Sequence, residues 1–206
     1  MSLILLEMNA AMARIRDDQL KPAFKIICRI SRIQQQIANV WDVVTTLTPS
    51  DYLSFRESLG QASGFQSYQY RMSELTMGNK NSQLAEVFSY DPDLYGKVQD
   101  ALNAPSVYEE SLKPLARRGF DLPSEILERN WSKPYQADGS VLAAWQMIYR
   151  NTEEQWDLYE LAEKLVDMED QFQRWRFRHF KSVERLIGNR MGTGGTTGAT
   201  YLEKAC

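Results

Sequence analysis

The sequence predicts an all-α fold, a single-domain bundle of long antiparallel helices. Apolar residues recur every three or four positions over long stretches, and no segment alternates apolar and polar residues as a half-buried strand would. No internal repeat or low-complexity tract interrupts this pattern. A chain of 206 residues is long enough for one large core, so we expect residues 1–206 to form one helical domain.

Two long helices are predicted at the start of the chain. An amphipathic stretch covers residues 4–15, a turn follows at 17–19, and a second helix covers 23–47. The apolar residues of the second helix alternate steps of four and three, which predicts its buried face: Ile26, Ile30, Ile33, Ile37, Val40, Val44 and Leu47. Because the turn is short, we expect the two helices to pack as an antiparallel pair.

Proline, glycine and capping residues divide the middle of the chain. Thr48-Pro49 begins a short helix through Leu59, and a further helix ends at Gly78. Asp91-Pro92 opens a polar helical hairpin, divided at Ala104-Pro105, which ends at Arg118-Gly119. Residues 120–140 carry two prolines and a glycine and are predicted to be an irregular surface excursion.

A last long helix is predicted over residues 151–187, before Gly188. Its apolar residues share one face: Leu165, Met168, Phe172, Trp175, His179, Val183 and Leu186. The only histidine of the chain therefore lies within an apolar stripe.

Composition and charge exclude several classes of protein. A net charge of -3 argues against a nucleic-acid partner, because phosphate binding depends on clustered Lys and Arg. The apolar run Leu3 to Leu6 stops at Glu7 and has no basic residue before it, so we expect neither a signal peptide nor a membrane span. Cys28 and Cys206 form no motif, which indicates a reducing, cytoplasmic location.

His179 has two interpretations. A lone histidine on an apolar face is more often a hydrogen-bonded core residue than a ligand. Its neighbours Phe172, Trp175 and Val183 would, however, supply aromatic and branched walls for a flat apolar macrocycle, and imidazole is a common haem ligand. Both a structural histidine and a haem ligand therefore stay open on the residues alone.

Arg56 is the main candidate for binding an anionic group. It lies one turn after Tyr52 and three residues before Leu59, so these side chains are expected on one side of the short helix. An arginine fork beside an apolar face suits a ligand with a carboxylate and a planar hydrophobic body. The alternative is a surface salt bridge to Asp51 or Glu57.

Two further segments could contribute to a site. Residues 192–198 contain four glycines but no lysine before Ser or Thr, so they are not a phosphate loop of the Walker kind. They suggest a mobile loop that brings backbone donors and hydroxyls to a ligand, or a disordered linker. Arg71 follows Phe65, Tyr68 and Tyr70, and a charged group in so aromatic a segment needs a partner, for which a haem propionate would serve.

Taken together, these segments resemble the tryptophan 2,3-dioxygenase family. The resemblance runs over essentially the whole chain and is most specific at residues 64–71, 172–179 and 192–195. It implies haem b as cofactor, with His179 as the proximal iron ligand, Trp175 near its outer nitrogen, and Arg71 as a propionate partner. The remaining implied positions are Ser63, Gly64 and Val183 around the haem, Tyr52 and Leu59 along the indole pocket, Arg56 at the substrate carboxylate, and Thr193 at the ammonium and carboxylate end.

The resemblance also implies an activity. Family members insert both atoms of dioxygen into the indole ring of L-tryptophan and form N-formylkynurenine, the first step of the kynurenine route, and they assemble as homotetramers. The family's distal histidine has no counterpart here, since His179 is the only histidine, so no catalytic side chain is assigned. We expect the chain to be truncated at both ends relative to the family. An inactive fragment that serves only as a helical oligomerisation or haem-binding module is the alternative.

Overall fold

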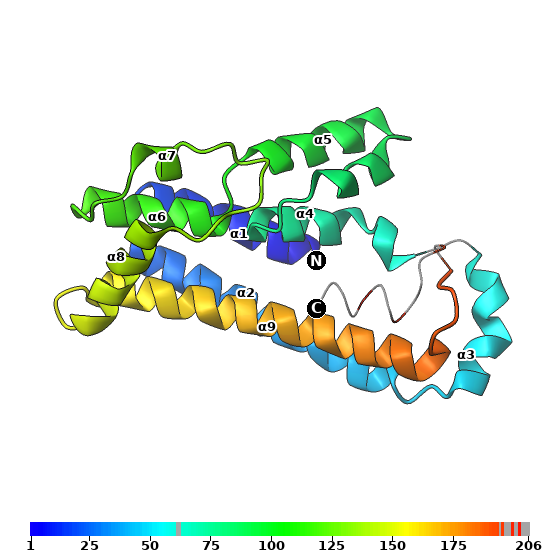
Figure 1. The fold of residues 1–206 in the computed structure, drawn as a ribbon. Coiled ribbons are helices and arrows are strands. Elements are labelled where there is room, and N and C mark those ends of the chain that lie inside the picture. The colour runs from blue at the N-terminus through cyan, green and yellow to red at the C-terminus, as the bar shows by residue number, and fades with distance from the viewer. Residues whose placement is uncertain (61–62, 194, 196–198, 200–201, 203–206) are drawn as a thin grey trace. The chain divides into compact units, whose positions relative to one another are not determined.

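A computed structural model confirms the all-α prediction. It describes residues 1–60, 63–193, 195, 199 and 202, and no strand occurs among them. The elements, shown in Figure 1, are α1 Ser2–Arg16, α2 Leu20–Val44, α3 Pro49–Phe55, η1 Arg56–Leu59, η2 Gly64–Gln66, α4 Tyr68–Met77, η3 Ser82–Leu84, η4 Glu86–Phe88, α5 Pro92–Asn103, α6 Val107–Arg117, α7 Ser124–Leu127, α8 Gly139–Arg150 and α9 Trp156–Ile187. Here η denotes a 3-10 helix.

The chain divides into two compact units, each made of two segments. Unit 1 comprises Met1–Ile30 and Tyr68–Val166, and unit 2 comprises Ser31–Ser67 and Asp167–Cys206. The long helices α2 and α9 each contribute to both units. In the part of the chain that the structure describes, no helix is long and apolar enough to cross a membrane.

Unit 1 has a core built on α1, α4, α5 and α6. Met8 and Ile15 of α1 are fully buried, as are Leu112 and Leu115 of α6, and α1 packs against both α6 and α4. A second group of buried residues surrounds Phe88, where α4 and α5 meet: Leu75, Ala85, Val98 and Leu102. These contacts remove large apolar side chains from water, which is the main force stabilising the unit.

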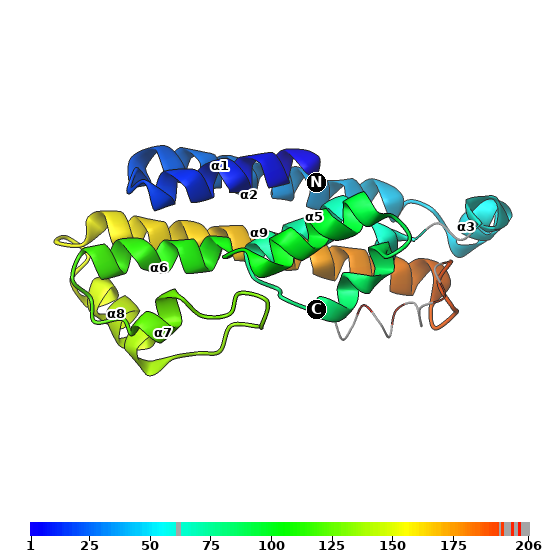
Figure 2. The ribbon, with the colours of Figure 1, turned by 90° about the horizontal axis from the view of Figure 1, so that it is seen from above.

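Ion pairs connect neighbouring helices of unit 1. Arg29 of α2 reaches Glu7 of α1 at 2.7 Å, which confirms the predicted antiparallel pair. Figures 1 and 2 both show α1 lying beside the first turns of α2. The buried carboxylate of Glu110 pairs with Arg16 of α1 at 2.9 Å and with Lys113 of its own helix at 2.9 Å, so two cations compensate its charge.

The predicted helix boundaries in the middle of the chain are confirmed where a cap defines them. Asp91 accepts hydrogen bonds from the backbone amides of Asp93 and Leu94 at the start of α5. Ser106 and Glu109 form a capping box at the start of α6. Gly78 ends α4 with a φ of 113°, a conformation that favours glycine, and an added Cβ would lie 3.3 Å from the Ser106 hydroxyl.

The buried face of α2 differs from the prediction. Of the predicted stripe only Ile30 is buried, and Val40 is 58% exposed. The other members are half-buried: Ile26, Ile33, Ile37, Val44 and Leu47. The buried residues of α2 are Leu20, Ala23, Ile27, Ile30, Gln34 and Ala38. Small alanines allow neighbouring elements to approach the helix closely, and the apolar pattern alone does not reveal which side of a helix meets such neighbours. The helix also ends at Val44 rather than at Leu47.

After α6 the structure confirms one prediction and differs in two places. The irregular excursion between residues 120 and 140 is confirmed, apart from the short α7. Arg129 holds this excursion through an ion pair with the buried Glu109 and a hydrogen bond of 2.7 Å that it donates to the Lys133 carbonyl. Helix α8, however, was not predicted, and α9 begins at Trp156 rather than at 151. Gln155 donates to the Asn151 carbonyl in the turn between these helices, so the polar residues that suggested a helix start form a connection instead.

Replacing Phe88 with Ala should destabilise unit 1 by about 3 to 5 kcal/mol, because the side chain is fully buried and its removal leaves a cavity. Urea unfolding followed by circular dichroism measures the change. The matched control is Tyr90→Ala, two residues away and 72% exposed, for which we expect less than about 1 kcal/mol. Equal losses in the two variants would contradict the assignment of this core.

Candidate functional site

Unit 2 contains nearly all the side chains that the sequence analysis selected. His179, Trp175 and Val183 lie on α9, and Arg56 lies on η1. The remaining selected residues of unit 2 are Tyr52, Leu59, Ser63, Gly64 and Thr193. Arg71 is the exception, since α4 belongs to unit 1.

The His179 imidazole lies in an aromatic environment made by α2 and α9. It stacks on Trp41 of α2, with ring centroids 4.8 Å apart and planes inclined by 17°. Trp175, one turn earlier on α9, lies 5.4 Å from it, and Phe172 continues the row by stacking on Trp175 at 6.3 Å. The ring is thus covered on one face by an indole and flanked by a second.

Sequence reasoning did not identify Trp41. The predicted stripe of α2 placed Val40 and Val44 inward, and a tryptophan 138 positions before His179 gives no local sign of contact with it. The nearest usable signal is its spacing of seven from Gln34, a residue of the observed buried face. The sequence therefore indicated the aromatic row on α9 but not its partner on α2.

Partial burial keeps the His179 ring neutral well below pH 7. Removal of the ring from water lowers its pKa from 6.5 to about 4, because desolvation disfavours the charged imidazolium. At pH 7 one ring nitrogen therefore carries a proton and the other carries a free lone pair. A neutral imidazole can coordinate a metal ion without first losing a proton.

Some polar atoms on the same part of α2 are buried without a hydrogen-bond partner. They are the indole Nε1 of Trp41 and both amide atoms of Gln34. A buried donor or acceptor left unpaired costs about 1 to 3 kcal/mol, so such groups usually have a role or a further partner. Trp41 combines this unpaired N–H with direct contact to the neutral imidazole.

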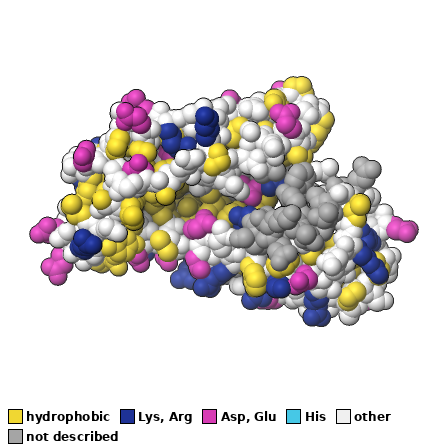
Figure 3. All heavy atoms as spheres, in the orientation of Figure 1, with side chains coloured by type: hydrophobic (Ala, Val, Ile, Leu, Met, Phe, Trp, Pro, Cys, Tyr) yellow, Lys and Arg dark blue, Asp and Glu magenta, His cyan; other side chains and the backbone are white. Residues whose placement is uncertain are grey.

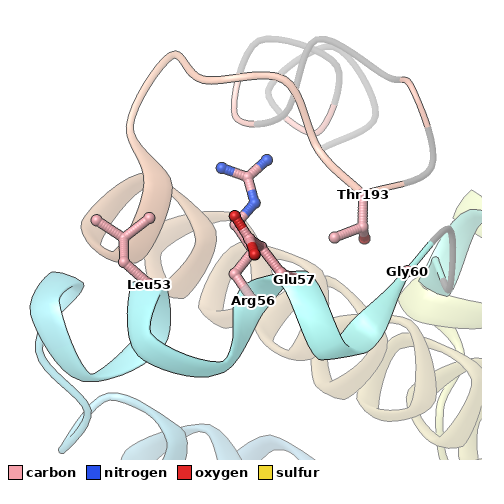
Figure 4. Close-up of a pocket in the computed structure, with 5 residues that line it drawn as sticks. All are labelled: Leu53, Arg56, Glu57, Gly60 and Thr193. Carbon is pink, nitrogen blue, oxygen red and sulfur yellow. The ribbon is translucent and has the colours of Figure 1, made fainter.

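A second feature of unit 2 is a cavity of about 380 Å³. Its lining comes from the α3–η1 segment and from the chain after α9, as Figure 4 shows: Leu53, Arg56, Glu57, Gly60 and Thr193. The first four of these residues follow one another at spacings of three, one and three, so they lie on one face of a helical segment. This face carries one positive and one negative side chain.

Arg56 is held by the backbone rather than by either acid considered in the sequence analysis. Its Nη2 donates a hydrogen bond to the carbonyl of Met191. Asp51 instead closes the capping box of α3, accepting from the Thr48 amide at 2.9 Å and from its hydroxyl at 2.7 Å, and these bonds lower the pKa of Asp51. Glu57 lines the cavity beside Arg56.

The cavity face is offset from the face that the sequence analysis selected. Tyr52 and Leu59 are not among the described residues that line the cavity; Tyr52 packs edge-on against Phe55 with ring centroids 5.5 Å apart. The chain changes from α-helix to 3-10 helix at Arg56, and the tighter winding alters which residues share a side. Arg56 belongs to both faces.

Arg71 is buried in unit 1 with a partner of its own. Its guanidinium pairs with the buried carboxylate of Glu74 and lies 5.1 Å from the centre of the Tyr70 ring. The need for a counter-charge in this aromatic segment is therefore met within α4. The contact between Arg71 and a haem propionate stays a prediction.

Only part of the glycine-rich segment 192–198 is described. Gly194, Thr196, Thr197 and Gly198 lie outside the described residues. Gly195 donates to the Gly192 carbonyl at 3.1 Å, which closes a turn around Thr193. Thr193 itself is half-buried and lines the cavity. Ser63 is half-buried and Gly64, which begins η2, is exposed.

Comparison with known proteins gives one consistent family. The family model described as tryptophan 2,3-dioxygenase matches residues 1–105 and 146–206. A tryptophan 2,3-dioxygenase of Bacillus thuringiensis (strain Al Hakam) is 50% identical over 204 residues, which covers 99% of this chain and 73% of the relative. The enzyme of Geobacillus thermodenitrificans (strain NG80-2) is 53% identical over 205 residues, which cover 73% of that relative. The enzyme of Burkholderia ambifaria (strain MC40-6) is 51% identical over 204 residues, which cover 66% of that relative.

The His179 ring should titrate near pH 4 in the haem-free protein. Nuclear magnetic resonance can follow its ring protons without ambiguity, because the chain has a single histidine. Between pH 6.5 and 4 the unfolded chain binds the proton and the folded chain does not. The free energy of unfolding should therefore fall as the pH is lowered through this window, by at most about 3 kcal/mol.

Trp41→Ala serves as the comparison for this titration. It opens one face of the imidazole to water, so the midpoint should move toward 6.5. An exposed-residue variant, Phe177→Ala, should leave the midpoint unchanged, since that side chain is 54% exposed. A wild-type midpoint at 6.5 would show that the ring is not desolvated.

Proposed function

Because this chain belongs to the tryptophan 2,3-dioxygenase family, we propose that it is a haem-dependent dioxygenase that converts L-tryptophan and dioxygen into N-formylkynurenine. The family match covers most of the chain, and the relatives are about half identical over its whole length. The proposal treats both units as parts of one haem-dioxygenase domain and includes haem b as the cofactor. The observation that carries it is the half-buried imidazole of His179, stacked on Trp41 and flanked by Trp175.

The residues around His179 fit a haem. A neutral imidazole has the lone pair that iron requires, and its neighbours Trp41, Trp175 and Phe172 offer flat apolar surfaces. The unpaired Trp41 Nε1 fits a site whose polar contacts are completed by a further group. When bound, haem iron would supply the binding and reductive activation of dioxygen.

The proposal assigns the cofactor-binding residues as follows. His179 would coordinate the iron, with Trp175 and Val183 beside it on α9. Ser63 and Gly64 would lie on the opposite side of the macrocycle, where a residue without a side chain permits close approach. Arg71 would meet a propionate. Since Glu74 already shares its charge, Arg71 would enter that contact as half of an ion pair.

Substrate binding would rest on the cavity of unit 2. Arg56 can bind a carboxylate through two parallel N–H donors, and the hydroxyl of Thr193 can contact the amino-acid end of the same ligand. Tyr52 and Leu59 would line the indole pocket. Closing these groups around the substrate excludes water and strengthens each polar contact. No side chain of this chain is assigned as a general base, because its only histidine is the proposed iron ligand.

The proposal also includes a homo-oligomer, by analogy with the family tetramer, in the cytoplasm. An exposed apolar surface on unit 1 supports the oligomer. Figure 3 shows hydrophobic side chains gathered where α8 and the beginning of α9 reach the surface. These helices expose Leu142, Met147, Tyr149 and Trp156, the last by 58%. Apolar surface of this kind often marks a contact between protein chains.

Reconstitution with haemin tests the proposal. The wild-type protein should develop a Soret band that L-tryptophan shifts, and His179→Ala should lose the normal band because the axial ligand is gone. Added imidazole should restore a ligated spectrum in this variant. An unchanged spectrum in His179→Ala would refute axial ligation. A Soret band without formation of N-formylkynurenine, when oxygen and reductant are supplied, would favour a haem-binding module. A colourless protein would favour an oligomerisation module.

Arg56→Ala should weaken L-tryptophan binding by about 2 to 4 kcal/mol, the range for removing one partner of a charge-assisted pair. Titration of the Soret shift, or calorimetry, measures this change. Arg174→Ala is the control, because that arginine pairs with Asp170 on the surface of α9 and does not line the cavity. Retained affinity in Arg56→Ala would remove Arg56 from the site.

A further inference from the structure

We propose that Arg56 also positions the segment that carries Thr193, through its hydrogen bond to the Met191 carbonyl. Binding a carboxylate needs only that the guanidinium face the cavity. The structure shows, in addition, that the Nη2 group of Arg56 donates to a backbone carbonyl two residues before Thr193. Both Arg56 and Thr193 line the same cavity (Figure 4). The part of this inference that concerns ligand affinity rests on the proposed function, and the part that concerns the ligand-free protein does not.

The chain between α9 and Thr193 consists of short turns with Met191 between them. Helix α9 ends at Ile187, and Gly188 follows in a left-handed conformation, with a φ of 57°. Arg190 donates to the Ile187 carbonyl at 3.2 Å, and the turn closed by Gly195 begins at Gly192. Each turn fixes only its own residues. The relation of the second turn to the first therefore depends on the backbone of Met191.

Met191 is held by its backbone more than by its side chain. The side chain is 65% exposed and adds little packing, whereas the carbonyl accepts the bond from Arg56. Because Arg56 stands on η1, that bond ties the segment after α9 to the helical segment that forms the rest of the cavity wall. The direction in which the chain leaves Met191 determines where the Thr193 hydroxyl lies.

A guanidinium can make this bond and bind a carboxylate at the same time. It carries five N–H donors, two on each terminal nitrogen and one on Nε. When Met191 takes one proton of Nη2, one edge of the fork still presents two parallel donors to a carboxylate. Arg56 would then connect the ligand carboxylate to the segment of Thr193, so a change at Arg56 affects both ends of an amino acid.

Limited digestion with trypsin tests the positioning in the ligand-free protein. Trypsin cleaves after arginine, and the Arg190–Met191 bond lies within the tethered segment. Arg56→Met keeps an unbranched apolar side chain and removes every donor. We expect cleavage at Arg190 to become about tenfold faster, the change that corresponds to loss of one charge-assisted hydrogen bond. Cleavage at Arg118–Gly119 in unit 1 should be unchanged and reports overall folding.

Arg178→Met is the matched control for this digestion. Arg178 is another arginine of unit 2, and its guanidinium bonds Asp42 between α9 and α2 rather than the segment after α9. Its replacement should leave cleavage at Arg190 at the wild-type rate. Equal rates in Arg56→Met and wild type would overturn the inference, and so would an equal increase in Arg178→Met.

Binding of tryptamine, which lacks the carboxylate, provides the second test. If Arg56 only binds the carboxylate, Arg56→Met leaves tryptamine affinity unchanged. If it positions Thr193, the variant weakens tryptamine severalfold, and Thr193→Ala weakens it no further in the Arg56→Met background. Failure of the wild-type protein to bind L-tryptophan would refute the proposed function while the trypsin result still decides the positioning role. Unchanged tryptamine affinity in Arg56→Met would refute the positioning role alone.

Discussion

The candidate haem site depends on the desolvation of one imidazole. Helices α2 and α9 hold the His179 ring against Trp41 and Trp175, and this desolvation lowers its pKa to about 4, so the ring stays neutral well below pH 7. A protonated ring in the same position would offer no lone pair to iron, and desolvation keeps the ring unprotonated well below pH 7. Aromatic packing therefore does two things in unit 2: it stabilises the contact between two long helices, and it extends to lower pH the range over which the imidazole is neutral.

The same contact explains why α2 matters to the site although it contributes no residue to the family motifs selected from the sequence. Asp42, the residue after Trp41 on α2, pairs with Arg178, the residue before His179 on α9. Apolar stacking and this ion pair together define how the two helices meet in unit 2. The stacking contributes more, because the ion pair is about half exposed and is weakened by water and salt.

The cavity of unit 2 follows a different principle. Here a polar side chain, Arg56, lies in a cavity and is bound to a backbone carbonyl. The arrangement keeps the guanidinium ordered without consuming its charge, since a carbonyl, unlike a carboxylate, leaves the net positive charge in place. In unit 1 the opposite holds for Arg71, whose charge is shared with Glu74. The two arginines that the sequence analysis selected for anionic groups therefore differ in the charge that each can offer to an anionic ligand.

The sequence by itself determined the fold class and the capped helix boundaries, and it selected candidate side chains for the site. Periodicity of 3.6 residues and caps such as Asp91 and Ser106 are local properties, so they can be read from neighbouring residues. His179, Arg56 and Thr193 were recognisable because their segments carry specific motifs. The tertiary structure decided which face of α2 is buried, that Trp41 stacks on His179, and that Arg56 bonds the Met191 carbonyl. The last two join residues more than 130 positions apart, and a backbone carbonyl has no residue-specific signature, so no local pattern could have specified them.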